Sequence, residues 1–178
     1  MKFVLIWSVF FGFSLLSTAE ELKSMSDVRF AEEIKAAANR HGLDPHLVRA
    51  VIFYESGFDP FARGNSGEIG LMQILPSGAV ADWARIKSQD IPSVHTLFDP
   101  DVNLEIGCWY LAYGIKKYAA YRQAIELALA RYNAGENRSE KWKPMHNNGD
   151  VLERIEIIGT RNYVEKVMER YKKYKGIL

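Results

Sequence analysis

The sequence predicts a mostly α-helical single domain, and three observations support this. Apolar residues recur with helical spacing along most of the chain, and Asp-Pro pairs and glycines stand where helices would begin and end. The 178 residues are 48% hydrophobic and 25% charged, which is typical of one packed globular domain and excludes a disordered or collagen-like chain. The single cysteine, Cys108, excludes an intramolecular disulfide and is expected to be a buried small hydrophobic residue.

The charges of the chain are nearly balanced, with 23 Lys and Arg against 22 Asp and Glu and a formal net charge of +1. A protein that binds nucleic acid or an anionic membrane surface usually carries a clear basic excess. We therefore expect no nucleic-acid partner. The histidines are scattered and no His/Cys/Asp cluster has metal-ligand spacing, so no metal site is expected.

The N-terminal segment predicts a secretory signal peptide. Lys2 precedes the apolar run Phe3–Leu16, and a small-residue site ends at Ala19. Cleavage after Ala19 removes residues 1–19 and leaves residues 20–178 as a periplasmic or secreted domain. The alternative is a retained membrane anchor, although the run is short for a span of about 20 apolar residues and no basic cluster follows it.

Six segments have the apolar spacing of a helix, most of them with cap residues. Asp44-Pro45 and Asp99-Pro100 each combine an N-cap residue with a proline of the first turn, and glycines follow several helix ends. The expected helices span Ser26–Arg40, Asp44–Ser56, Pro76 to about Arg85, Asp99–Tyr118, Arg122 to about Asn133, and Thr160 or Asn162 to about Lys175.

Two segments are expected to lack regular helix. Gly57–Gln73 contains four glycines and no helical period, so it should form a loop or a small hairpin. Glu136–Gly149 is polar, contains Pro144 and ends on Asn-Asn-Gly, so it should leave the helical framework.

Glu55 is the residue that physical reasoning alone marks as a candidate for function. At about 100° per residue, its side chain lies within about 60° of Val51 and Ile52, on the apolar stripe of its helix. Burial disfavours the charged carboxylate, and so does the negative end of the helix dipole, so the pKa of Glu55 should be raised. Such a carboxyl group can act as a general acid. The residues leave open that Glu55 turns to water at a frayed helix end.

Two further segments are candidates for a site around Glu55. Gly70-Leu71-Met72-Gln73 follows the glycine-rich loop, where small residues allow close backbone approach and the glutamine offers a donor and an acceptor. Tyr132-Asn133 places a phenol and an amide at a helix end, and the Tyr132 hydroxyl could hold the Glu55 carboxyl. The plain alternatives are an ordinary turn and a core tyrosine.

Four blocks in order, AVIFYESGF (50–58), GLMQ (70–73), ALARYNAG (128–135) and TRNYV (160–164), resemble the catalytic domain of lytic transglycosylases of the soluble type, the SLT domain. The resemblance covers about Phe30 to Tyr171, nearly the whole mature chain. It implies a lysozyme-like, goose-type fold with the glycine-rich loop or hairpin beside a cleft.

The resemblance also implies an activity and a set of site residues. The family cleaves the β-1,4 bond between N-acetylmuramic acid and N-acetylglucosamine of peptidoglycan without water, leaves a 1,6-anhydromuramic acid end and needs no cofactor. Glu55 matches the single catalytic acid/base, Tyr132 matches the tyrosine that positions it, and Tyr163 matches an aromatic residue near the cleft floor. The residues expected to bind substrate are Ser56, Met72, Gln73, Tyr132, Asn133 and Tyr163.

Three departures from the family pattern affect the loops. Glu68 stands where the family usually has Ala, so a charge enters the glycine-rich loop. The serine common earlier in that loop has no secure counterpart, because Ser66 lies closer than expected to Gly70. Glu136-Asn137 replaces a frequent Gly-Pro. These departures put loop shape and subsite preference in question, not the chemistry.

Two other functions compete with transglycosylation. A goose-type lysozyme would use water and release reducing ends, and an inactive relative would only bind peptidoglycan. The presence of Glu55, Gln73 and Tyr132 argues against the inactive relative. The expected partner is the peptidoglycan glycan strand, bound by a monomer. A role beside an envelope assembly or secretion apparatus is compatible with this activity.

Overall fold

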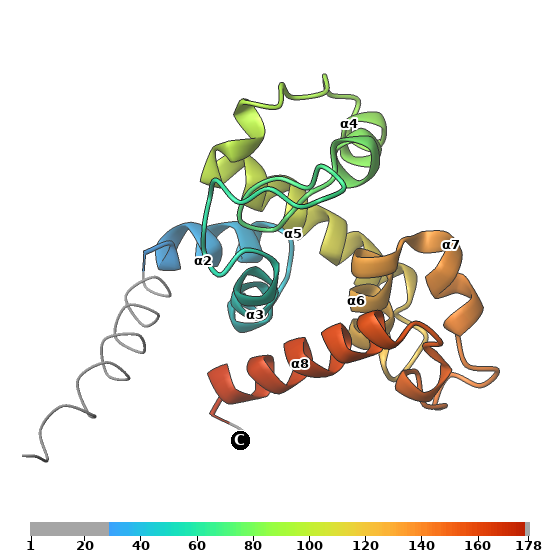
Figure 1. The fold of residues 1–178 in the computed structure, drawn as a ribbon. Helices are drawn as coiled ribbons and strands as arrows, with labels where there is room; N and C mark the ends of the chain where they lie inside the picture. The colour runs from blue at the N-terminus through green and yellow to red at the C-terminus, as the bar shows by residue number, and fades with distance from the viewer. Residues whose placement is uncertain (1–28, 177–178) are drawn as a thin grey trace, which may run out of the picture.

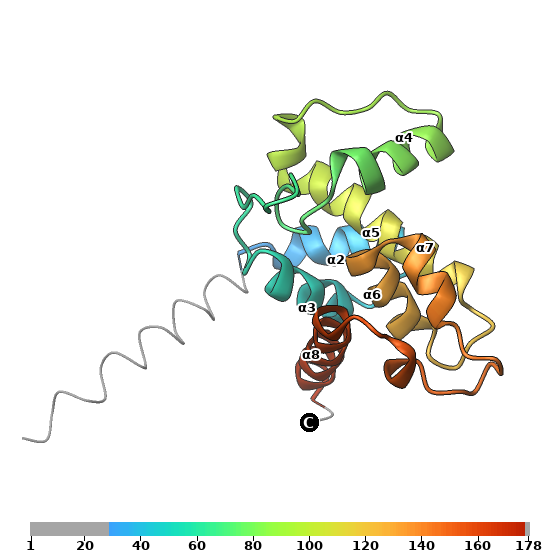
Figure 2. The ribbon, with the colours of Figure 1, turned by 45° about the vertical axis from the view of Figure 1, so that its right-hand side comes forward.

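Helix α5 (Pro100–Lys117) contributes more buried residues than any other helix of the computed structural model, which describes residues 29–176. It contacts both α2 (Ala31–Arg40) and α6 (Ala124–Ala134). Helix α3 (Pro45–Glu55) contacts α2 and the C-terminal helix α8 (Ile158–Tyr174), which crosses α3 and α6 (Figures 1 and 2).

Short elements connect these helices. Within residues 29–176, β pairing is confined to two isolated antiparallel bridges, Arg63 with Ile69 and Ile69 with Ile74, in the glycine-rich loop. The predicted mostly α-helical fold is therefore confirmed, and the loop contains bridges rather than a regular hairpin. The short elements are η1 (Pro76–Val80), α4 (Ala81–Lys87), η2 (Thr96–Phe98), α7 (Glu136–Ser139), η3 (Glu140–Trp142) and η4 (Leu152–Arg154).

The two Asp-Pro signals begin helices as predicted. Asp44 Oδ1 accepts the backbone N–H of His46 at 2.9 Å, which caps α3. Asp99 Oδ1 accepts the backbone N–H of Asp101 at 2.9 Å at the start of α5. In each case the aspartate accepts a hydrogen bond from an N–H of the first turn that has no partner within the helix. The proline stands at a position where an N–H would have had no helical partner either.

Other predicted boundaries were wrong or lie outside the described residues. The first helix begins at Ala31 after a turn, and its expected cap, Ser26, is outside the described residues. The last helix begins at Ile158, before both candidate caps, because the Thr160 hydroxyl donates to Asn133 Oδ1 instead of capping the helix. The 136–149 segment is partly helical, since the indole of Trp142 is buried and anchors α7 and η3 to the core.

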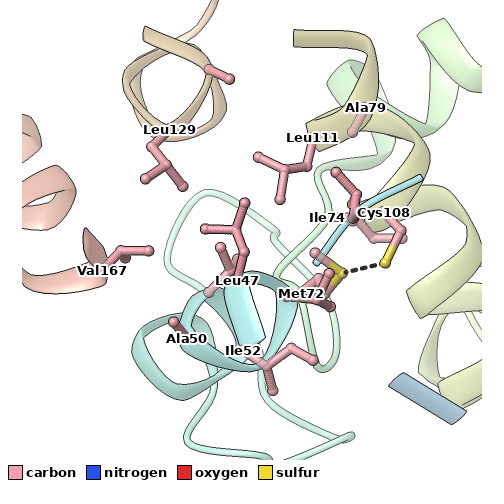
Figure 3. Packing of buried hydrophobic residues seen from close by; sticks show 14 of the residues in the cluster. Leu47, Ala50, Ile52, Met72, Ile74, Ala79, Cys108, Leu111, Leu129 and Val167 are labelled. Carbon is pink, nitrogen blue, oxygen red and sulfur yellow. Dashed lines mark hydrogen bonds between the residues drawn. The ribbon is translucent and has the colours of Figure 1, made fainter. Parts of the chain in front are cut away.

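One hydrophobic core joins α2, α3, α5, α6 and α8 with the glycine-rich loop. Figure 3 shows Met72 and Ile74 from the loop beside Cys108 of α5 and Leu47 and Ile52 of α3. Cys108 is fully buried, as predicted, and its thiol lies 3.9 Å from the Met72 sulfur. The loop is therefore part of the core rather than a surface connection, which fixes its position against the end of α3.

The predicted signal peptide, residues 1–19, lies outside the described part of the chain. Among the helices between residues 29 and 176, none has the length and hydropathy required to cross a bilayer.

Candidate active site

Glu55 is the last residue of α3, and its side chain is directed toward α8. Val48, Val51 and Ile52 of the same helix are fully buried, so the apolar stripe predicted for this helix is present. Glu55 Oε1 accepts the hydroxyl of Tyr163 from α8 at 2.5 Å, and the side chain is only partly exposed. The alternative in which Glu55 turns away to water is thus not the conformation of this helix end.

The surroundings of Glu55 favour its neutral form. Burial raises the pKa of the Glu55 carboxyl to about 7, the hydrogen bond from Tyr163 opposes this rise, and the negative charge of Glu68 adds to it. Burial and the nearby Glu55 charge also hold the pKa of the Tyr163 hydroxyl well above its usual value, so this tyrosine remains a donor. A carboxyl group with a pKa near 7 can give and take a proton at neutral pH.

The glycine-rich loop is held in place by the buried side chain of Asn103 from α5. Asn103 Oδ1 accepts the backbone N–H of Met72 at 2.8 Å, and its Nδ2 donates to the carbonyls of Ile69 and Leu97 at 2.9 and 2.8 Å. Gly70 adopts a φ of +75°, and a Cβ there would lie 2.3 Å from Asn103 Nδ2. Only glycine satisfies both the backbone conformation and this close approach.

Two hydrogen bonds join this loop to the helices that carry the candidate residues. Ser56, next to Glu55, donates its hydroxyl to the Leu71 carbonyl at 2.8 Å. The Tyr132 hydroxyl donates to the Met72 carbonyl at 2.7 Å. The expected bond from Tyr132 to the Glu55 carboxyl is therefore replaced by the bond from Tyr163. The hydroxyl of Tyr132 is used to hold the loop, while α8 brings the other tyrosine within reach of Glu55.

The match to a known family covers most of these elements. The sequence profile of the "Transglycosylase SLT domain" matches residues 32–154, more than half of the chain. The chain belongs to this family.

Two relatives and one solved structure illustrate the similarity. The chain is 34% identical over 107 residues to membrane-bound lytic murein transglycosylase E of Buchnera aphidicola, covering 60% of this chain and 46% of that protein. It is 30% identical over 172 residues to membrane-bound lytic murein transglycosylase C of Edwardsiella ictaluri, covering 84% and 47%. The X-ray structure of an inactive mutant of lytic transglycosylase Slt from Pseudomonas aeruginosa matches with a TM-score of 0.70 and 30% identity, covering 85% and 26%. The chain thus spans about half the length of these curated relatives.

Of the other candidate residues, Met72 and Gln73 lie in this loop, whereas Asn133 lies near the end of α6 and contacts α8. The Met72 side chain is fully buried, so it can affect a substrate only through the loop position that it fixes. Gln73 has a φ of +45°, and its Nε2 donates to the carbonyls of Ala62 and Gly70 at 3.1 and 3.0 Å. Asn133 is exposed, and its Oδ1 accepts the Thr160 hydroxyl at 2.8 Å.

Sequence reasoning understated the part that α8 plays at this site. Thr160 and Tyr163 are three residues apart, so they share one face of α8, and they contact Asn133 and Glu55 respectively. That spacing was available in the sequence as a signal that this face meets the site. Among residues 29–176, no group of three or more His, Cys, Asp and Glu side chains is arranged to hold a metal ion.

Proposed function

We propose that this SLT-domain protein is a murein lytic transglycosylase. Its substrate would be the β-1,4 bond between N-acetylmuramic acid and N-acetylglucosamine in peptidoglycan, and its product a 1,6-anhydromuramic acid end. The observation that carries the proposal is the Glu55 carboxyl, which burial brings to a pKa of about 7 while the Tyr163 hydroxyl fixes its orientation. The named activity of the relatives supports the same reaction.

In this reaction Glu55 performs two proton transfers. The protonated carboxyl first gives its proton to the glycosidic oxygen, so that the bond to the anomeric carbon of the muramic acid breaks and the N-acetylglucosamine leaves with a hydroxyl. The resulting carboxylate then takes the proton of the muramic acid C6 hydroxyl while that oxygen attacks the anomeric carbon. Glu55 ends protonated, as it began, and no water is consumed. A pKa near the working pH favours both steps.

The neighbouring residues would orient the acid and the loop. Tyr163 donates to one carboxyl oxygen of Glu55, which leaves the other oxygen for the substrate. Ser56 and Tyr132 hold the backbone of the loop through the Leu71 and Met72 carbonyls, so the loop cannot shift without breaking these bonds. Geometry held in advance in this way accounts for a large part of the rate of an enzyme.

The test is product analysis with purified sacculi. Wild-type protein should release muropeptides with anhydro ends, which mass spectrometry distinguishes from the reducing ends that a goose-type lysozyme would produce. The Glu55→Gln variant should lose at least about 100-fold of this activity while remaining folded. Glu165→Gln, which removes the charge of an exposed glutamate on α8, is the matched control. Muropeptides with reducing ends would show that the protein is a hydrolase. A protein that sediments with the sacculi but releases no muropeptides would be an inactive binding module.

We further propose that the protein acts in the periplasm or after secretion, as a monomer on glycan strands. The support is the sequence of residues 1–19, with its basic start, apolar run and small residues up to Ala19. N-terminal sequencing of exported protein should find a start at Glu20. An intact residue 1–19 segment in washed membranes would assign the membrane anchor instead. Work beside an envelope assembly or secretion apparatus is compatible with this location.

A further inference from the structure

A small pocket of about 260 Å³ lies between α3 and α8, and the proposed reaction does not use it. Its lining residues are Tyr54 of α3 and Glu169, Arg170 and Lys173 of α8. Tyr54 directly precedes Glu55 in the chain, so the pocket lies next to the end of α3 that carries Glu55. The pocket is therefore placed to contact a group attached to a substrate bound at Glu55.

The pocket and Glu55 lie along the same contact between the two helices. The Tyr163 hydroxyl binds Glu55, and Arg170 follows Tyr163 by seven residues, which is two helical turns on nearly the same face of α8. Two turns correspond to about 10 Å along the helix axis. Arg170 in turn contacts Phe53, two residues before Glu55. The same two helices therefore hold the acid and the pocket at a fixed separation.

Aromatic rings hold the guanidinium of Arg170. Its central carbon lies 3.8 Å from the centroid of the Phe53 ring, 5.7 Å from that of Tyr174 and 6.0 Å from that of Tyr54. A guanidinium that lies 3.8 Å from a ring centroid presents its flat face to the ring, so its N–H groups stay available at the edge. The residue is only partly exposed, so the rings also fix where these N–H groups lie.

The donors of this guanidinium have no acceptor in the protein. Within residues 29–176, Arg170 forms ring contacts but no hydrogen bond and no ion pair, although a guanidinium carries five N–H donors. Lys173 is exposed three residues further along the same face and lines the same pocket. Glu169, the acidic residue of the lining, is exposed and pairs with neither cation in this part of the chain. Two cations against one carboxylate favour an anionic ligand.

We propose that this pocket binds a carboxylate of the peptide that the muramic acid of the substrate carries, with Arg170 as its main ligand. This inference rests on the proposed function and extends it to the part of the substrate beside the cleaved bond. The planar fork of the guanidinium matches the two oxygens of a carboxylate, and Lys173 adds a second positive charge. An extended peptide advances about 3.3 Å per residue, so three to four residues span the distance of about 10 Å from a sugar at Glu55.

The kinetic test compares glycan strands that carry their peptides with strands from which an amidase has removed them. Wild-type protein should have the higher kcat/KM on the peptide-bearing strands, mainly through a lower KM. Arg170→Gln should reduce the ratio of the two kcat/KM values at least about tenfold, the loss expected for a charge-assisted hydrogen bond. Arg170→Lys keeps the charge but not the fork and should give an intermediate ratio. Lys172→Gln removes one exposed positive charge from the opposite side of α8, so this matched control should keep the wild-type ratio.

NMR titration of the wild-type protein gives a second readout that requires no turnover. A disaccharide-peptide from digested sacculi should shift the side-chain signals of Arg170, and the same disaccharide without its peptide should not. Lys173→Gln, at an exposed position where the packing stays intact, should weaken binding of the disaccharide-peptide about threefold or more. Equal shifts with inorganic phosphate alone at the same concentration would show a non-specific anion site and overturn the proposal.

The role of the pocket and the proposed function fail in different ways. Equal kcat/KM on both kinds of strand, or a wild-type ratio in Arg170→Gln, would overturn the role of the pocket, while anhydro products would still support the proposed function. A wild-type protein that releases no muropeptides from either kind of strand would overturn the proposed function. The titration then decides about the pocket: a shift at Arg170 that requires the peptide supports it, and no shift overturns it.

Discussion

At the scale of single residues, the site places Glu55 where it lowers the stability of the folded protein. The carboxyl ionises with a pKa of about 7 in the folded state, against an ordinary value of 4.5. A group whose folded pKa is raised contributes its full stability below the unfolded pKa and loses it as the pH rises through the folded pKa. Between about pH 4.5 and 7, Glu55 therefore makes the folded state progressively less stable. In the proposed reaction, the same raised pKa is what suits the group to act as an acid at neutral pH.

Replacing Glu55 by Gln should accordingly stabilise the protein at alkaline pH. We expect the free energy of unfolding of Glu55→Gln at pH 8 to exceed that of wild type by about 1 to 3 kcal/mol, since the amide is never ionised. Urea unfolding at pH 8 and at pH 4 measures this difference. At pH 4 the carboxyl is mostly protonated in both states, so the two proteins should have nearly equal free energies of unfolding. An equal difference in the free energy of unfolding at both pH values would mean that packing, not ionisation, causes the stabilisation.

Two tyrosine variants separate orientation of the acid from support of the loop. Tyr163→Phe removes the hydrogen bond that favours ionised Glu55, so the pKa of Glu55 should rise further and activity should persist to higher pH. Its kcat should fall about 10- to 100-fold because the carboxyl is less well oriented. Tyr132→Phe removes the bond to the Met72 carbonyl and should leave the alkaline limit unchanged. Kinetics on isolated glycan strands over a pH range would measure both, and an upward shift in Tyr132→Phe alone would reverse the assignment.

At the scale of elements, the helices could be predicted from the sequence and the loop contacts could not. Helices α3 and α5 begin at Asp-Pro because the cap and the proline act locally, within the first turn. The clamp on the glycine-rich loop depends on Asn103, which lies 31 residues from Met72 in the chain. A contact between residues so far apart in the chain cannot be predicted from local propensities. The start of α8 was misplaced for the same reason, because Thr160 has a tertiary partner.

The clamp predicts different outcomes for two glycines of the same loop. Gly70 and Gly57 both have positive φ, but a Cβ on Gly70 would overlap Asn103, whereas a Cβ on Gly57 would meet nothing within 4 Å. Gly57→Ala should therefore cost about 1 kcal/mol of stability through backbone strain alone. Gly70→Ala should cost about 2 to 4 kcal/mol, because Asn103 must move and leave buried partners without hydrogen bonds. Urea unfolding measures both, and equal losses would show that the loop accommodates the methyl group.

At the scale of the whole molecule, the site exists only because α8 packs against α3. Glu55 and Tyr163 are 108 residues apart in the chain, and their hydrogen bond joins the C-terminal end of α3 to the N-terminal part of α8. The sequence identified Glu55, since its position on an apolar stripe is a local property. It did not identify Tyr163 as the partner of Glu55, because the choice between Tyr163 and Tyr132 depends on how α6 and α8 pack. The motifs occur in the order typical of the family, which placed both tyrosines near the site and left their contacts undetermined.

A second set of polar contacts between α3 and α8 lies at the N-terminal end of α3. Asp44 uses one carboxyl oxygen to cap α3, while the other accepts the Tyr171 hydroxyl at 2.9 Å and lies 3.2 Å from Lys175 Nζ. Burial acts to raise the pKa of Asp44, but the hydrogen bonds from His46, Tyr171 and Lys175 outweigh it and hold this pKa below its usual value. One side chain therefore both starts α3 and fastens α8 to it.

Two substitutions of Asp44 separate these two roles. Asp44→Ser keeps a cap but loses the contacts to α8, and should cost about 1 kcal/mol at pH 7. Asp44→Ala loses both and should cost about 2 kcal/mol. A carboxylate with a lowered folded pKa stabilises the folded state above its unfolded pKa, and this effect is lost as the pH falls through the folded pKa. The difference in stability between Asp44→Ser and wild type should therefore shrink in acid.

Asp44→Ser should also lower kcat a few-fold, since a looser α8 holds Tyr163 less firmly against Glu55. Urea unfolding at pH 7 and pH 3, with kinetics at pH 7, tests this; wild-type stability and kcat in Asp44→Ser would show that α8 is held by its apolar face alone.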